Sequence, residues 1–206
     1  MPTPETIDRP PFPPLARDEY FWSGTDILPS WAGFRARQGM YASESGGGVP
    51  SDGTANVAVD APADSGPGPE QVAAYAYLKA NEAVVAAAAV RAVFERYPRE
   101  RAKHGFDDID EDDEDAVAEA GLMPEISDPN DLRPLLGLGT VHVLAVARDG
   151  VAYVGLEFGC TWDDEHGVGV MLHKDRVVKV GGADTSFLAW IAERDGGRPL
   201  DPSGPA

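Results

Sequence analysis

Residues 140–160, TVHVLAVARDGVAYVGLEFGC, contain two runs of apolar and β-branched residues on either side of Asp149-Gly150. An Asp-Gly pair tolerates the positive φ angles of a tight hairpin turn, and runs of this composition favour strands. The stretch therefore predicts a β-hairpin with strands at 140–148 and 151–160. This hairpin is the strongest secondary-structure signal in the chain and favours a fold built on an antiparallel sheet.

A second hairpin is predicted in the residues that follow, VGVMLHKDRVVKVGG, with its turn at Lys174-Asp175. Its strands, 168–173 and 176–180, extend the first hairpin into a four-stranded antiparallel meander.

Helices are predicted on both sides of this meander. Residues 69–97 form an Ala-rich segment that begins with a proline at the first helical position and an early glutamate, both typical of a helix start. Its centre is apolar on all sides, which is typical of a helix covered by other elements. We expect one long helix that ends immediately before Pro98, because proline disfavours a helical conformation at the preceding residue.

Two shorter helices complete the prediction. One covers EDAVAEA, where acidic residues favour the helix start and Gly121 follows the end. The other covers SFLAWIAER, with Asp184 or Thr185 as its cap and with Phe187, Leu188 and Ile191 on one stripe. The predicted fold class is α+β, a mainly antiparallel sheet packed on the long Ala-rich helix and the C-terminal helix.

The remaining segments define the domain organisation. Six prolines in the first fourteen residues predict an N-terminal arm at 1–19, held by Phe12 and Leu15. A single domain is expected at 20–195 and a loose tail at 196–206. Within the domain we expect one or two strands in residues 31–43. The Gly/Pro-rich segment 44–68 predicts a loop or hairpin connections around a short strand at 56–59, and residues 107–115 predict a solvated acidic loop.

Composition limits the partners and the compartment. The formal net charge is −18, so a phosphate backbone is repelled and nucleic-acid binding is not expected, whereas a basic protein partner is attracted. The longest apolar stretch of the helical segment is far shorter than the roughly 20 residues of a membrane span. The N-terminus resembles no signal peptide, and the single cysteine, Cys160, predicts a small core residue. Together these features predict a cytoplasmic protein.

The connection between the two hairpins carries the most concentrated polar chemistry in the chain. It comprises Trp162, Asp163, Asp164, Glu165, His166 and Gly167, with Gly169 just beyond. In a structural role, aspartate bonds nearby backbone amides, glycine permits the chain reversal and tryptophan supplies buried area. Alternatively, the same residues form a surface for a protein partner.

A metal or acid/base site is the third interpretation of this connection. Asp163, Glu165 and His166 are its candidate ligands, since carboxylates and imidazole bind divalent cations. His166 and His173 are an odd number of residues apart, which places them on opposite faces of a continuous strand. His142 is a further candidate, from a neighbouring strand. No Cys pair and no H-E-x-x-H spacing supports zinc.

Other catalytic signatures are missing from the sequence. There is no G-x-S-x-G elbow, no phosphate-binding G-x-x-x-x-G-K-[ST] loop and no dinucleotide fingerprint. We therefore assign no catalytic residue and no cofactor, and favour a non-enzymatic function.

The connection also resembles a family signature. Trp162, Asp163, Glu165, His166, Gly167 and Gly169 match a W-D-x-E-H-G-x-G pattern that is similar to that of a bacterial family of domains of unknown function. That family looks related to families found beside polymorphic toxins, some of which are immunity proteins. The resemblance implies a protein-binding module, most specifically an immunity-type inhibitor that covers the active surface of a toxin. The alternatives are a metal-dependent enzyme that uses residues 162–167 and a small regulatory or scaffold domain.

Overall fold

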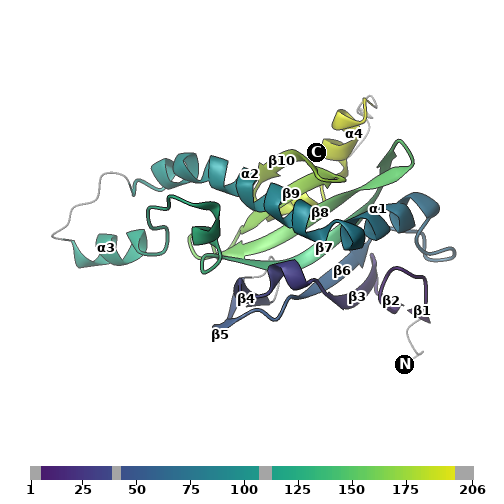
Figure 1. Cartoon of the computed structure of the whole chain (residues 1–206), viewed down its shortest axis with the longest axis horizontal. Helices are drawn as coiled ribbons and strands as arrows, with labels where there is room; N and C mark the ends of the chain where they lie inside the picture. Colours follow the sequence, from purple (N-terminus) through teal and green to yellow (C-terminus); the bar gives the residue numbers. More distant parts are fainter. Residues whose placement is uncertain (1–5, 39–42, 107–112, 198–206) are drawn as a thin grey trace.

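The computed structural model describes residues 6–38, 43–106 and 113–197, and its centre is one twisted sheet (Figure 1). The sheet has eight strands in the order β1-β2-β3-β6-β7-β8-β9-β10, and every neighbouring pair is antiparallel except β6 and β7. The strands are β1 (Thr6–Ile7), β2 (Leu15–Arg17), β3 (Trp22–Ile27), β6 (Thr54–Val59), β7 (Leu136–Arg148), β8 (Val151–Cys160), β9 (Val168–His173) and β10 (Arg176–Gly181). The α+β class with a mostly antiparallel sheet is thus confirmed.

Helices and a small ribbon surround this sheet. The α-helices are α1 (Pro69–Ala80), α2 (Glu82–Lys103), α3 (Glu114–Ala120) and α4 (Ala189–Asp195). The 3-10 helices are η1 (Pro29–Trp31), η3 (Pro129–Leu132) and η4 (Ala183–Ser186). The ribbon pairs β4 (Arg35–Gln38) with β5 (Glu44–Pro50) and lies against the start of β7.

The C-terminal meander has the predicted strands and turns. Asp149 and Gly150 have φ angles of 51° and 74°, so the Asp-Gly turn has the positive φ that its composition favours. Lys174 has a φ of 59° at the second turn. β7 begins four residues earlier than predicted, at Leu136, because its first residues pair with the end of β8.

The Ala-rich segment forms two helices, so the prediction of one long helix is wrong. The break is at Asn81, whose φ and ψ are −123° and 26° and whose Nδ2 donates to the Tyr77 carbonyl at 2.9 Å. The two helices cover different strands: α1 packs on β7 and β8, and α2 packs on β10. A change of direction between them lets both follow the twisted sheet.

Helix α2 also continues through Pro98, contrary to the prediction that it ends there. Proline removes one backbone donor, and contacts on both sides of it compensate for this loss. Tyr97 donates from its hydroxyl to the Pro124 carbonyl at 2.8 Å, and Arg101 Nε donates to the Met123 carbonyl at 3.1 Å. These bonds hold the last turns of α2 against residues 123–124.

The C-terminal helix begins at Ala189, later than predicted, so Phe187 and Leu188 precede it and the cap is Leu188. Asp184 and Thr185 belong instead to η4, which lies directly on the sheet. Two glycines permit this contact. A Cβ added at Gly155 would lie 1.6 Å from the Ser186 oxygen, and one at Gly169 would lie 2.4 Å from the Gly182 oxygen.

The N-terminal half contains more strands than the sequence predicts. β1 and β2 pair at the sheet edge within the predicted arm, where Phe12 and Leu15 are buried as expected. The segment 44–68, predicted as a loop or hairpin connections, contains β5, which the sequence did not predict, and β6, which extends the short strand expected at 56–59.

The structure describes only part of the other segments that the sequence predictions cover. In the segment 31–43, β4 is the described strand and Trp31 lies in η1. The predicted short helix is confirmed as α3. Residues 39–42, most of the predicted acidic loop (107–112) and most of the predicted tail (198–206) lie outside the described residues.

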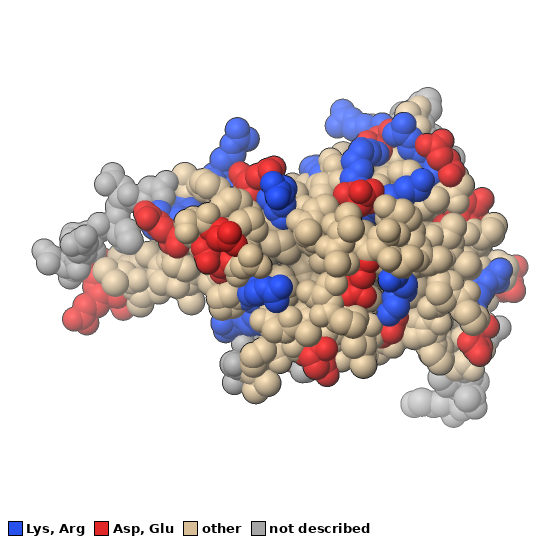
Figure 2. Space-filling view, viewed as in Figure 1, with Lys and Arg blue, Asp and Glu red and all other residues tan. Residues whose placement is uncertain are grey.

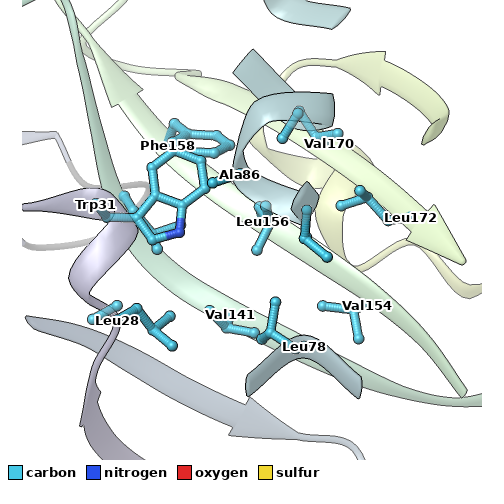
Figure 3. Packing of buried hydrophobic residues seen from close by; sticks show 14 of the residues in the cluster. Leu28, Trp31, Leu78, Ala86, Val141, Val154, Leu156, Phe158, Val170 and Leu172 are labelled. Carbon is cyan, nitrogen blue, oxygen red and sulfur yellow. The ribbon is translucent and has the colours of Figure 1, made fainter. Parts of the chain in front are cut away.

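The main core lies between the sheet and helices α1 and α2 (Figure 3). Trp31 packs edge-on against Phe34 and beside Phe158, with ring centroids 5.1 Å apart in each case. The opposite face of the meander carries a smaller cluster under α4, composed of Leu144, Tyr153, Met171, Ile191 and Ala192. The central strands β8 and β9 are therefore buried on both faces, which explains why they are almost continuously apolar.

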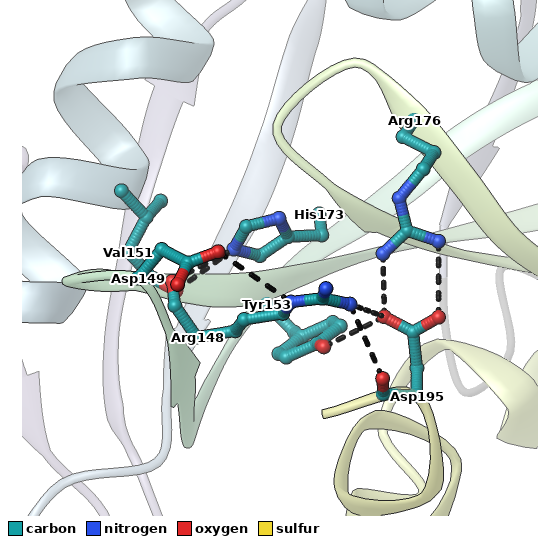
Figure 4. Close-up of polar contacts among 7 residues, drawn as sticks. All are labelled: Arg148, Asp149, Val151, Tyr153, His173, Arg176 and Asp195. Atoms are coloured by element: carbon teal, nitrogen blue, oxygen red, sulfur yellow. Dashed lines mark hydrogen bonds and ion pairs between the residues drawn. The ribbon is translucent and has the colours of Figure 1, made fainter. Parts of the chain in front are cut away.

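A polar network fastens α4 to the two hairpin turns (Figure 4). Asp195 accepts from the Tyr153 hydroxyl at 2.7 Å and from Arg176 Nη1 at 3.0 Å. Arg148 Nη1 donates to the Asp195 carbonyl at 3.2 Å. The Arg176 guanidinium, together with the Tyr153 hydroxyl, lowers the pKa of Asp195 to about 2, although burial opposes the shift.

Candidate functional site

The segment from Trp162 to Gly167 forms the corner between β8 and β9, as the sequence predicts. Asp163 shapes this corner from within. Its Oδ1 accepts from the His166 backbone amide at 2.9 Å and lies 3.0 Å from His166 Nδ1. The Asp163 carbonyl accepts from the Gly167 amide at 3.0 Å, and Gly167 has a φ of 54°. The corner is thus a turn closed by one aspartate and permitted by one glycine.

Trp162 packs inward from the corner and is half-buried. Its ring meets Tyr97 of α2 edge-on, with centroids 5.2 Å apart and planes at 89°. Such aromatic pairs add stabilisation beyond their buried area. Trp162 therefore ties the corner to α2.

Arg37 of β4 supports the corner from below, a role that the sequence did not indicate. Its guanidinium donates to the Cys160 and Ser43 carbonyls and forms an ion pair with Asp164 at 3.3 Å. The Arg37 side chain is 2% exposed, whereas that of Asp164 is 71% exposed. The Arg37 guanidinium is buried and held by backbone carbonyls. Its ion pair restrains the Asp164 carboxylate, which is otherwise exposed.

The outer side of the corner consists of Asp164, Glu165 and His166, all exposed. The His166 side chain is 73% exposed, even though its Nδ1 contacts Asp163. Gly169 is not part of this surface, because it lies in β9 beneath η4. The corner therefore presents two carboxylates and an imidazole to solvent on a backbone fixed by internal hydrogen bonds.

The three candidate metal ligands are only partly assembled. Asp163 and His166 are in contact, but no hydrogen bond joins Glu165 to either of them. Throughout residues 6–38, 43–106 and 113–197, no group of three or more His, Cys, Asp or Glu side chains is placed to hold a metal ion.

The other candidate histidines lie elsewhere. His173 Nε2 donates to the carbonyls of Arg148 and Val151, at 3.0 and 3.3 Å. Cys160 is fully buried, and burial raises the pKa of its thiol to about 12. This thiol is protonated at neutral pH and behaves as the expected core residue.

His142 and Glu157 form a buried polar pair that sequence reasoning missed. His142 Nε2 and Glu157 Oε2 lie 2.6 Å apart, and the side chains are 12% and 7% exposed. The rings of Phe21 and Phe187 flank the imidazole, with centroids 6.5 and 5.2 Å away. The two residues are diagonal neighbours on β7 and β8, whose register pairs His142 with Gly155 and Thr140 with Glu157, and the sequence alone does not give that register.

A small cavity of about 90 Å³ adjoins the inner side of the corner. Trp162, Asp163 and Gly167 line it from the corner, and Tyr97 and His104 line it from α2. Its size suits a few water molecules rather than an organic substrate.

Charged side chains of both signs are spread over the face in Figure 2, without one continuous patch of either sign. Of the helices that the structure describes, none has the length and apolar character needed to cross a membrane.

Comparison with known proteins identifies one family. A family model described as "Domain of unknown function (DUF6985)" matches residues 49–188, which include the parallel β6–β7 pair, α1, α2, the meander and the corner. No curated protein and no solved structure matches the chain. The chain belongs to this family of domains of unknown function.

Proposed function

We propose that this chain is a protein-binding module that presents the β8–β9 corner to a basic partner. The observation that carries the proposal is the contrast within the corner. Its backbone is fixed by Asp163, Gly167 and Arg37, whereas Asp164 and Glu165 project into solvent. Side chains held on a pre-organised backbone lose less conformational freedom on binding.

The overall charge supports a basic partner. A net charge of −18 creates an attractive field for a cationic protein and increases its rate of encounter. Trp162 does not serve as a free anchor, because it already packs on Tyr97. Recognition therefore depends on the polar outer side of the corner, and Trp162 keeps that surface in place.

The most specific form of this proposal is an immunity-type inhibitor that covers the active surface of a toxin. The W-D-x-E-H-G-x-G resemblance supports this form, and the exposed position of Asp164, Glu165 and His166 is compatible with it. Such an inhibitor needs no cofactor, only a complementary surface.

Co-purification with the product of the adjacent gene, followed by binding kinetics on the purified pair, tests the proposal. Glu165→Lys reverses an exposed charge at the corner and should lower the association rate constant several-fold at low salt, with a smaller effect at high salt. Asp64→Lys is the matched control. Asp64 is also exposed, but it follows β6 at the end of the sheet opposite the corner.

The proposal fails if the adjacent gene product does not bind. It also fails if the two variants slow association equally, because the corner would then contribute only its share of the net charge.

A further inference from the structure

The outer edge of β10 is a second surface with the features of a binding site. β10 is the last strand of the sheet, and within residues 6–38, 43–106 and 113–197 no strand pairs with its outer side. It is six residues long, whereas β1 at the opposite edge has two. An open strand of this length can accept a guest strand, because its unpaired amides and carbonyls form a template.

Elements on both faces of the sheet flank this edge (Figure 1). On one face, α2 and β10 flank a shallow, open groove lined by Ala92, Glu95, Arg96, Arg99, Glu100, Lys103 and the valines of β10. On the other face, Lys179 lies over the ring of Trp190, with its Nζ 4.7 Å from the centroid. A guest strand would thus meet α2 with one set of alternate side chains and Trp190 with the other.

The apolar content of the groove suits a strand. Val177, Val178 and Val180 are half-buried, and a bulge between Val177 and Lys179 directs them to both faces. Arg96 Nη1 donates to the Val180 carbonyl at 3.0 Å. A guest strand would replace this side-chain donor with a backbone amide.

The charge of the groove selects its occupant. Three cations, Arg96, Arg99 and Lys103, line the groove together with two carboxylates, Glu95 and Glu100, and the Lys179 charge lies on the Trp190 side of the same edge. Glu100 is shared by Arg96 and Lys103, at 2.6 and 3.0 Å. Within the described part of the chain Arg99 has no ion pair, and Lys179 has only its aromatic contact. This local positive excess contrasts with the net charge of −18.

We propose that the β10 edge, between α2 and Trp190, binds an extended acidic segment of a partner protein that adds to the sheet as a further strand. A second copy of this chain fits less well, because pairing two β10 edges would bring like-charged grooves together. This inference goes beyond the proposed function, since it concerns another surface and a partner of opposite charge.

The test uses purified full-length protein and a blocked peptide of alternating Glu and Val, at least as long as β10. Titration is followed by Trp fluorescence and by backbone amide resonances. The peptide should bind, with amide shifts in β10 and none in β1. A Lys/Val peptide and an N-methylated Glu/Val peptide should bind at least about tenfold more weakly, which corresponds to about 1.4 kcal/mol.

Charge-reversal variants distinguish binding at the β10 edge from an effect of the protein's net charge. Arg99→Glu combined with Lys179→Glu should lower affinity about tenfold, whereas Arg91→Glu, an exposed arginine of α2 outside the groove, should have little effect. The proposal is overturned by absent binding, by equal binding of the Lys/Val or N-methylated peptide, or by equal loss in both variants. Self-association through β10 would overturn it as well. None of these outcomes depends on the partner of the corner.

Discussion

At the scale of single residues, Gly155 has the tightest surroundings of the described glycines. Its missing side chain lets the backbone of Ser186 rest on β8. Gly155→Ala should therefore force η4 away from the sheet and lower the free energy of unfolding by about 3 kcal/mol, in the range of overpacked core substitutions. Urea denaturation measures the change.

Gly68→Ala is the control for this experiment. A Cβ at Gly68 would lie 3.6 Å from its nearest neighbour, an ordinary contact, and φ there is −77°. Its cost should be clearly smaller than that of Gly155→Ala. Equal losses of unfolding free energy would show that η4 moves away from Gly155 without destabilising the fold.

The candidate site was predictable only where its contacts are local. Asp163 and Gly167 act within a few residues of themselves, and turn chemistry indicated their roles. Arg37 reaches the corner from 127 residues before Asp164, and Glu157 meets His142 across a strand pair. Such partners depend on register and topology, which the local pattern does not encode.

At the scale of elements, Asp195 supplies the polar part of the contact between α4 and the meander, beside the apolar cluster under α4. The folded-state pKa of Asp195 is about 2, below its ordinary value of 3.8, so the carboxylate stabilises the fold at pH values above about 4. That stabilisation is lost as the pH falls from about 4 towards 2.

Asp195→Asn should lower the free energy of unfolding by about 1 kcal/mol at neutral pH, and the difference from wild type should shrink in this acid range. Urea titrations at several pH values measure it. Asp64→Asn is the control, and a pH-independent difference for Asp195→Asn would contradict the assignment.

Elements were predictable where periodicity and turn residues agree. The meander satisfies both conditions, and its strands and turns are confirmed. β3 was missed because its sequence, WSGTDI, has polar and small residues where a strand signal needs apolar ones. The break at Asn81 and the passage through Pro98 were missed because packing against β10 and residues 123–124 outweighs local propensity.

At the scale of the whole molecule, the net charge of −18 acts against the compact state. Raising NaCl from about 0.01 M to about 0.5 M shortens the screening length several-fold and weakens this repulsion. The melting temperature should therefore rise with salt, as measured by calorimetry. An unchanged or lower melting temperature would show that attractive ion pairs, such as those of Asp195, balance the repulsion.

The parallel pairing of β6 with β7 also governs how the chain assembles. Only four residue pairs, from Asn56 with Thr140 to Val59 with Val143, join these strands, and about eighty residues separate them along the chain. Hairpins close quickly because their contacts are local, whereas this junction closes a long crossover that contains α1 and α2. We therefore expect the C-terminal meander to form before the N-terminal strands pair with it.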